Sequence, residues 1–179
     1  MRLRLLSVPT LALLALTGCT STGGFELGID LAEQRVDGNP VGGLLGGFFE
    51  VPIPLMVDLA AETAARDTGP AQRVRLVELS LAITPTAESE GDTDDFGFLD
   101  GAEIFVESAD AGSSLRRQRI ATLEEVPEGA RELFFATDPE VDLLPYIDEG
   151  ARLTSSAEGT VPPDDVTFDG RAVLSVEVL

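Results

Sequence analysis

The feature that most constrains the fold is a repeated pattern of short segments in which apolar and polar residues alternate. Apolar residues lie at every second position of residues 25–31, and again near the end of the chain at Ala172, Leu174, Val176 and Val178. A period of two places successive side chains on opposite faces of a β-strand, so each segment is predicted to be a strand with one buried face. Gly, Pro, Asp and Ser separate these segments and indicate turns.

Further strands are expected at 73–83, 102–107, 119–123, 132–136 and 151–157. Seven or eight short strands with frequent turns favour an all-β fold, either an immunoglobulin-like or a related Greek-key β-sandwich. A small open barrel is the alternative.

Local signals refine this pattern. The apolar phase shifts by one residue between Leu76 and Val77, which indicates a β-bulge. Residues 51–59 have apolar residues at odd positions but prolines between them, so they are expected to form an edge strand or an extended entry. Two brief helices are expected. One covers the Ala-rich residues 59–66, and the other begins at Asp138 as N-cap and is ended by Pro145.

The N-terminus has the form of a secretory signal peptide. Arg2 and Arg4 precede an apolar run over residues 5–16 that is shorter than the roughly 20 residues of a membrane-spanning helix. The run closes on Leu16-Thr17-Gly18-Cys19, which resembles the lipobox of bacterial lipoproteins. The alternative is an ordinary secretory leader with a chance cysteine.

The resemblance implies that the leader is cut before Cys19 and that this cysteine carries a diacylglyceryl thioether and an N-acyl chain such as palmitate. Two or more acyl chains give stable attachment to a bilayer. Thr20 stands where an aspartate would resemble an inner-membrane retention signal, so the outer membrane is expected if the source is Gram-negative. The expected organisation is a signal peptide at 1–18, lipidated Cys19 and a tether at 19–24, and a single β-sandwich domain at 25–179.

The charge of the chain excludes several classes of function. Removing a leader that carries Arg2 and Arg4 takes the formal net charge from −20 to −22, which disfavours binding to nucleic acid. The chain has no His, and all 12 basic residues are Arg, so neither a Ser-His-Asp triad nor a Ser-Lys dyad is possible. With its single cysteine consumed by lipid, the chain has no cysteine left to form a disulfide.

An acidic segment offers one candidate metal site. Asp92, Asp94, Asp100 and Glu103 occupy positions 1, 3, 9 and 12 of a stretch that resembles the calcium loop of an EF-hand. The stretch departs from that pattern because Phe96 stands at position 5 and because strands, not helices, are expected around it. The hypothesis is one Ca²⁺ held outside a helix-loop-helix frame, and the alternative is a solvated acidic loop.

Two other segments stand out. Val41–Phe49 is rich in glycine and apolar residues. Its larger side chains are expected beneath the sandwich, and the alternative is an exposed loop that contacts a membrane or partner. Arg116-Arg117-Gln118-Arg119 is the only basic cluster. It is expected to pair with acids on neighbouring strands, and the alternative is a site for a carboxylate or phosphate ligand.

These observations predict a lipid-anchored cell-envelope protein with a non-catalytic binding, adhesion or structural role. No cofactor is expected to be required, and stabilisation by Ca²⁺ is a hypothesis. Its expected contacts are the membrane, through the lipid on Cys19, and an envelope protein partner that the sequence does not identify. The alternative is a carboxylate-based hydrolase acting on envelope glycans, which needs two carboxyl groups about 5–9.5 Å apart in one cleft. A carrier of a small apolar ligand would need an enclosed cavity of at least a few hundred Å³.

Overall fold

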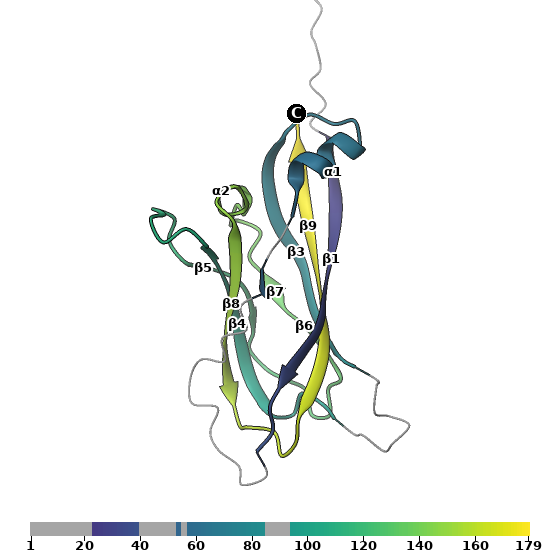
Figure 1. Cartoon of the computed structure of the whole chain (residues 1–179). Coiled ribbons are helices and arrows are strands. Elements are labelled where there is room, and N and C mark those ends of the chain that lie inside the picture. Colours follow the sequence, from purple (N-terminus) through teal and green to yellow (C-terminus); the bar gives the residue numbers. More distant parts are fainter. Residues whose placement is uncertain (1–22, 40–52, 55–56, 85–93) are drawn as a thin grey trace, which may run out of the picture.

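The protein is an all-β sandwich of two antiparallel sheets, as the alternating segments predict (Figure 1). The computed structural model describes residues 23–39, 53–54, 57–84 and 94–179. The four-stranded sheet has the order β1-β9-β3-β6, and the five-stranded sheet has the order β2-β8-β4-β5-β7.

The strands of the first sheet are β1 (Gly23–Val36), β9 (Val166–Val178), β3 (Ala71–Ile83) and β6 (Glu132–Phe134). Those of the second sheet are β2 (Ile53–Pro54), β8 (Ala151–Gly159), β4 (Leu99–Ser108), β5 (Gln118–Leu123) and β7 (Ala136–Thr137). The helices are α1 (Leu59–Ala65) and α2 (Leu144–Asp148).

The core lies between the sheets and is centred on β9. This strand pairs with β1 on one side and with β3 on the other, and every second residue from Val166 to Val178 is buried. Leu174 and Val176 are 0 % exposed, which confirms the alternation seen in the sequence. Phe96 is also 0 % exposed and packs edge-to-face on Phe168, with ring centroids 5.7 Å apart.

The expected bulge is present in β3. Its pairing with β9 shifts by one residue between Leu76 and Glu78, and Val77 is left 41 % exposed. The extra residue therefore keeps the apolar residues on both sides of the shift on the buried face of the strand.

The prediction for residues 138–145 is wrong. The Asp138 carboxylate does accept a hydrogen bond from the Glu140 amide at 3.0 Å, but the chain forms a turn there and no helix. The helix α2 begins at Leu144, with Pro145 in its first turn. A proline needs no hydrogen-bond acceptor at that position, so Pro145 starts the helix that it was expected to end.

Residues 132–136 divide between the two sheets, whereas one continuous strand was expected. β6 belongs to the first sheet and β7 to the second, and the chain crosses between them at the buried Phe135, whose amide donates to the Leu79 carbonyl at 3.0 Å. This crossing connects the sheets along one side of the sandwich. Along the other side, the sheets end at β1 and at the two-residue β2.

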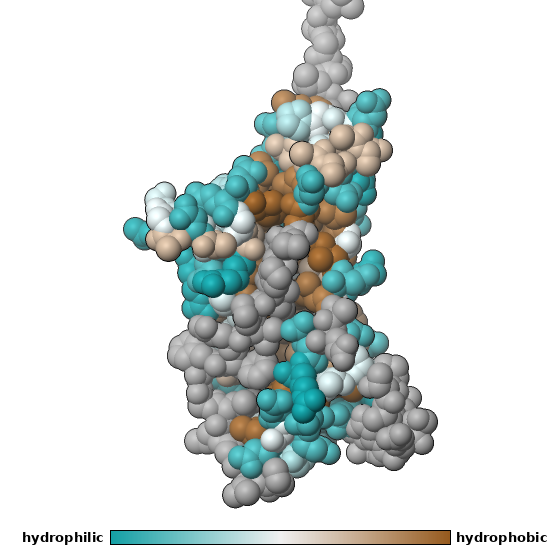
Figure 2. Space-filling view, viewed as in Figure 1, coloured by the Kyte–Doolittle hydropathy of each residue, from teal (hydrophilic) through white to brown (hydrophobic). Residues whose placement is uncertain are grey.

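The end of the sandwich at which β1 begins also carries α1 and the C-terminus (Figure 1). α1 is the brief helix expected from the Ala-rich residues, and the Asp58 carboxylate caps it by accepting from the Ala61 amide at 2.9 Å. No helix among the described residues is long and apolar enough to cross a membrane. Figure 2 shows mainly hydrophilic residues on the outer surface and hydrophobic surface between the two sheets in its upper half.

Candidate functional site

The predicted anchor and the glycine-rich stretch lie outside the described residues. The lipidation of Cys19 and the burial of the larger side chains of Val41–Phe49 therefore stay predictions. β1 begins at Gly23, and Gly23 and Gly24 pair with Val178 and Glu177, although both glycines were expected in the tether. Three residues thus separate Cys19 from the first paired residue of the domain.

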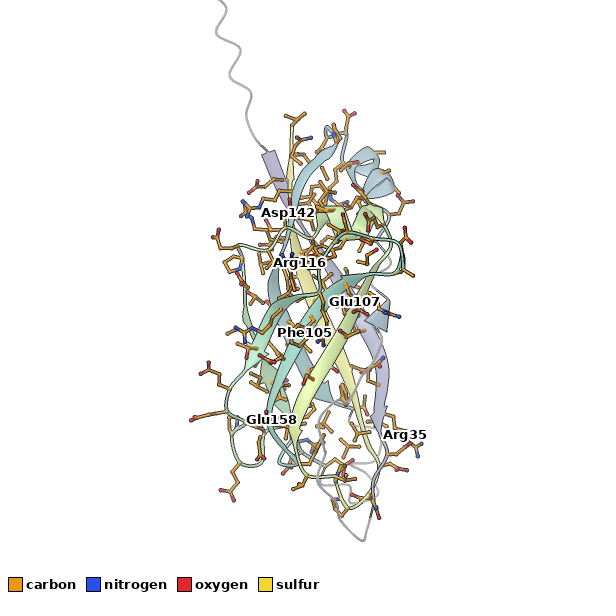
Figure 3. The ribbon with its side chains drawn as sticks, turned by 90° about the vertical axis from the view of Figure 1, so that its left-hand side faces the viewer. Arg35, Phe105, Glu107, Arg116, Asp142 and Glu158 are labelled. Carbon is orange, nitrogen blue, oxygen red and sulfur yellow. The ribbon has the colours of Figure 1, made fainter. Side chains whose placement is uncertain are left out.

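The basic cluster lies on the outer face of the five-stranded sheet, which Figure 3 presents to the viewer. The Arg117 guanidinium lies over the Phe105 ring at 3.6 Å from its centroid. Its Nε donates to Thr154 Oγ1 at 3.2 Å, and Thr154 is only 6 % exposed. An aromatic ring, a cation and a buried hydroxyl group thus form a compact cluster between β4, β5 and β8.

Ion pairs flank this cluster along β4. Arg119 Nη1 donates to Glu103 Oε1 at 2.6 Å, and Arg152 Nε donates to Glu107 Oε1 at 2.8 Å. The hydrogen bond and the charge of Glu103 raise the pKa of Arg119. Both pairs are exposed, so each contributes about 0–1 kcal/mol to stability. The prediction that the basic cluster of residues 116–119 pairs with acids on neighbouring strands is confirmed for Arg119.

Arg116 differs from its neighbours. Its side chain is exposed and, within the described residues, has no hydrogen-bond or ion-pair partner. Its carbonyl oxygen accepts a hydrogen bond from the Tyr146 hydroxyl at 2.6 Å. Burial raises the pKa of Tyr146, so this hydroxyl remains a donor at neutral pH. The bond connects α2 to the segment that precedes β5.

An open groove of about 630 Å³ lies beside this bond. Its walls combine apolar side chains with carboxylates and one arginine. The residues that line it are Leu115, Gln118, Arg119, Asp138, Glu140, Val141, Asp142, Pro145 and Tyr146.

Two of the groove's three carboxylates hold the backbone in place. Asp142 Oδ1 accepts from the amides of Val74 and Leu144, both at 3.1 Å, and Asp138 Oδ1 accepts from the Glu140 amide. Asp138 and Asp142 therefore help to fix the backbone that forms the groove. No carboxylate among the described residues is buried.

The predicted calcium ligands are only partly described, because Asp92 lies outside the described ranges. Asp94 lines a pocket of about 500 Å³ beside the loop 160–165, Asp100 is exposed in β4, and Glu103 is paired with Arg119. Within the part of the chain that is described, no three Asp, Glu or Cys residues are grouped so that they could hold a metal ion. The calcium site therefore stays a prediction.

The interior offers little room for a carried ligand. The apolar space between the sheets measures about 70 Å³ in the described part of the protein. Pockets for small molecules commonly measure about 300–1,000 Å³. This space therefore gives no support to a carrier function.

Sequence reasoning missed two features of this surface. Phe105 alternates with buried residues of β4 and so falls on the outer face between Glu103 and Glu107, a pattern that the sequence does contain. An aromatic ring on a charged face was the available signal for the contact with Arg117. The contact between Asp142 and Val74 joins positions 68 residues apart, and nothing local in the sequence indicates it.

Comparison with known proteins does not assign a family. No protein-family model matches the chain, and a search of curated proteins gives no significant match.

Proposed function

We propose that this chain is a lipid-anchored protein of the cell envelope whose β-sandwich binds a partner close to the membrane without catalysing a reaction. The proposal combines the lipobox-like Leu16-Thr17-Gly18-Cys19 with the position at which the fold begins. Because Gly23 is already paired in β1, the chain from Cys19 to Gly23 spans at most about 14 Å.

The observation that carries the proposal is the pairing of Gly23 with Val178 at one end of the sandwich. A lipid on Cys19 would hold that end, together with α1, next to the bilayer (Figure 1). β9 has 13 residues, so the sandwich extends about 43 Å from this end. The loops at the other end, including 37–39 and 160–165, would point away from the membrane.

The described carboxylates support binding over catalysis. They are exposed or half-buried, and several hold backbone amides or arginines. A hydrolase acting on envelope glycans remains the alternative, but no described pair of acids has the burial that favours it. If the source is Gram-negative, Thr20 favours the outer membrane as the location.

The test is expression of the full chain in a Gram-negative host, followed by membrane fractionation and mass spectrometry of the N-terminal peptide. The wild-type protein should lack residues 1–18, carry acyl groups on Cys19 and sediment with the outer membrane. Cys19→Ala should be found in the soluble envelope fraction with an unchanged melting temperature. Thr20→Asp is the matched control, because it should keep the lipid but move the protein to the inner membrane.

A retained leader or an unmodified thiol on the wild-type protein would refute the anchor. The calcium hypothesis is tested separately by calorimetric titration of the same protein. If about millimolar Ca²⁺ produces no heat of binding and no shift in the melting temperature, the calcium hypothesis is refuted.

A further inference from the structure

The first observation concerns the outer edge of β1. β1 is 14 residues long, longer than the usual 3–10 residues of a strand, and it lies at the end of the four-stranded sheet. It pairs with β9 along one side, and no other described strand pairs with it. The free side of such a strand presents unpaired N–H and C=O groups that can pair with another extended chain.

The second observation is that the core is incomplete along this edge. Leu27 and Ile29 of β1 are half-buried, whereas their partners on β9, Leu174 and Ala172, are 0 % exposed. All four side chains point to the same inner face. The side chains of β9 are therefore fully covered, whereas those of β1 remain partly exposed. A further strand beside β1 would bury Leu27 and Ile29.

The third observation is an unfilled apolar space between the two sheets, which residues of β1 and β8 line together with residues of β3, β4 and β9. Its volume is about 70 Å³, a little over twice the ~30 Å³ share of a water molecule in the liquid. An apolar space of this size has room for one small apolar side chain. The residues of the two strands that line it are Leu31, Gln34 and Val36 on β1 and Leu153, Ser155 and Ala157 on β8.

The fourth observation is the charge on the outer face of β1. Glu26 has no hydrogen-bond or ion-pair partner within the described residues. Asp30 is 83 % exposed and forms an ion pair of 3.7 Å with Arg171 of β9, so most of its carboxylate stays accessible. Gly28 lies between them, and the Arg171 guanidinium lies over it, since a Cβ at Gly28 would be 3.3 Å from Arg171 Nη2. These two carboxylates favour positive side chains on a neighbouring strand.

We propose that the free edge of β1 is a docking site for an extended segment of a partner protein in which apolar residues alternate with Arg or Lys. The segment would add a fifth strand to the sheet. Its apolar side chains would cover Leu27 and Ile29, and its cations would face Glu26 and Asp30. Main-chain pairing gives affinity in this mode of recognition, and the alternating side chains give specificity.

This inference rests on the proposed binding function, since it names the surface and the partner chemistry for it. It does not depend on the lipid, because the edge and its carboxylates belong to the folded domain. A failure of the anchor would therefore leave the docking site unaffected, and the two proposals can be tested separately.

The test uses the full processed chain in detergent, and the Cys19→Ala chain in parallel, with labelled peptides of about ten residues. The probe alternates Val and Arg, one control has the same residues in two blocks, and another alternates Val and Glu. Affinity is measured by fluorescence anisotropy at about 0.15 M salt, and the contact is located by amide hydrogen exchange.

The alternating Val-Arg peptide should bind both chains and protect those amides of residues 24–30 that do not already donate to β9. The block peptide and the Val-Glu peptide should bind at least about tenfold more weakly. The double variant Glu26→Arg, Asp30→Arg should bind the Val-Arg peptide about tenfold more weakly than the wild type does, and it should bind the Val-Glu peptide more tightly. Glu125→Arg with Glu128→Arg changes the net charge equally in a distant loop and should alter affinity less than about twofold.

Several results would overturn the proposal. Equal affinity for the alternating and block peptides would mean that net charge alone attracts them. Protection outside β1, or no binding, would exclude the edge. The amides of β1 that do not donate to β9 are the ones that report on the free edge. If these amides are already protected without peptide, the edge is occupied by this chain itself when the protein is a monomer, or by a second copy when its mass is that of a dimer.

Discussion

Phe96 tests most directly whether the acidic segment is part of the core. The ring is 0 % exposed and contacts Phe168 at 5.7 Å and Phe98 at 6.3 Å between ring centroids. Its amide also donates to the Ala130 carbonyl at 2.8 Å. The residue at position 5 of the calcium-like pattern is therefore an interior anchor of the loop and is not available as a ligand.

Replacing Phe96 with Ala should cost about 4 kcal/mol of unfolding free energy. Substitutions of buried Phe by Ala cost about 3–5 kcal/mol, and the two ring contacts favour the upper part of that range. Phe96 also lines the existing 70 Å³ space, so the new cavity would merge with one that the surrounding strands have already left unfilled. At about 3 °C per kcal/mol for a domain of this size, the melting temperature should fall by about 12 °C.

The assay is urea unfolding followed by circular dichroism, with thermal unfolding as a second measurement. Phe134→Ala is the matched control, because this ring is 65 % exposed and its loss should cost no more than about 0.5 kcal/mol. A loss below about 1 kcal/mol for Phe96→Ala, or equal losses for the two variants, would refute the placement of Phe96 in the core.

Three further predictions concern the surface around the groove. Tyr146→Phe removes one hydrogen bond and should lower the unfolding free energy by about 1 kcal/mol. Because the pKa of Tyr146 is raised in the folded protein, the stability of the wild type should be full below the ordinary tyrosine pKa of about 10 and should fall as the pH rises above it. Melting curves recorded at a series of pH values should show a smaller fall for the variant. Phe105→Ala and Arg117→Ala should show a coupling energy of about 0.5–1 kcal/mol in a double-mutant cycle of unfolding free energies, whereas additive losses would deny the contact. Asp142→Ala leaves two backbone amides without their acceptor and should lower the unfolding free energy by about 2–3 kcal/mol in urea titrations, and a neutral effect would contradict this role.

The sequence predicts the strands of this fold better than their arrangement. Alternation identifies β9 and the phase shift identifies the bulge at Val77, because burial of one face imposes a period of two on the sequence. The sheet to which a strand belongs depends on contacts far apart in the chain. The division at Phe135 illustrates this, since the residues on both sides of it fit one continuous strand.

A short sequence pattern gives a wrong prediction where two different local structures share that pattern. Asp138 followed by Pro139 suits a helix start, but it also suits the turn in which Asp138 accepts from the Glu140 amide. Pro145 is equally compatible with the end of one helix and the start of the next. For the surface, the sequence predicts that the arginine cluster meets acids, but it does not identify Glu103 as the partner of Arg119, because that choice depends on the register between β4 and β5.

The central position of β9 has a consequence for how the domain is made. β1 and β3 do not pair with each other, and both need β9 between them, so the first sheet has no stable order before Val166–Val178 has been synthesised. A nascent chain that lacks β9 can form neither the β1–β9 pairing nor the β3–β9 pairing, so the first sheet is completed only after the last of the described strands has been made.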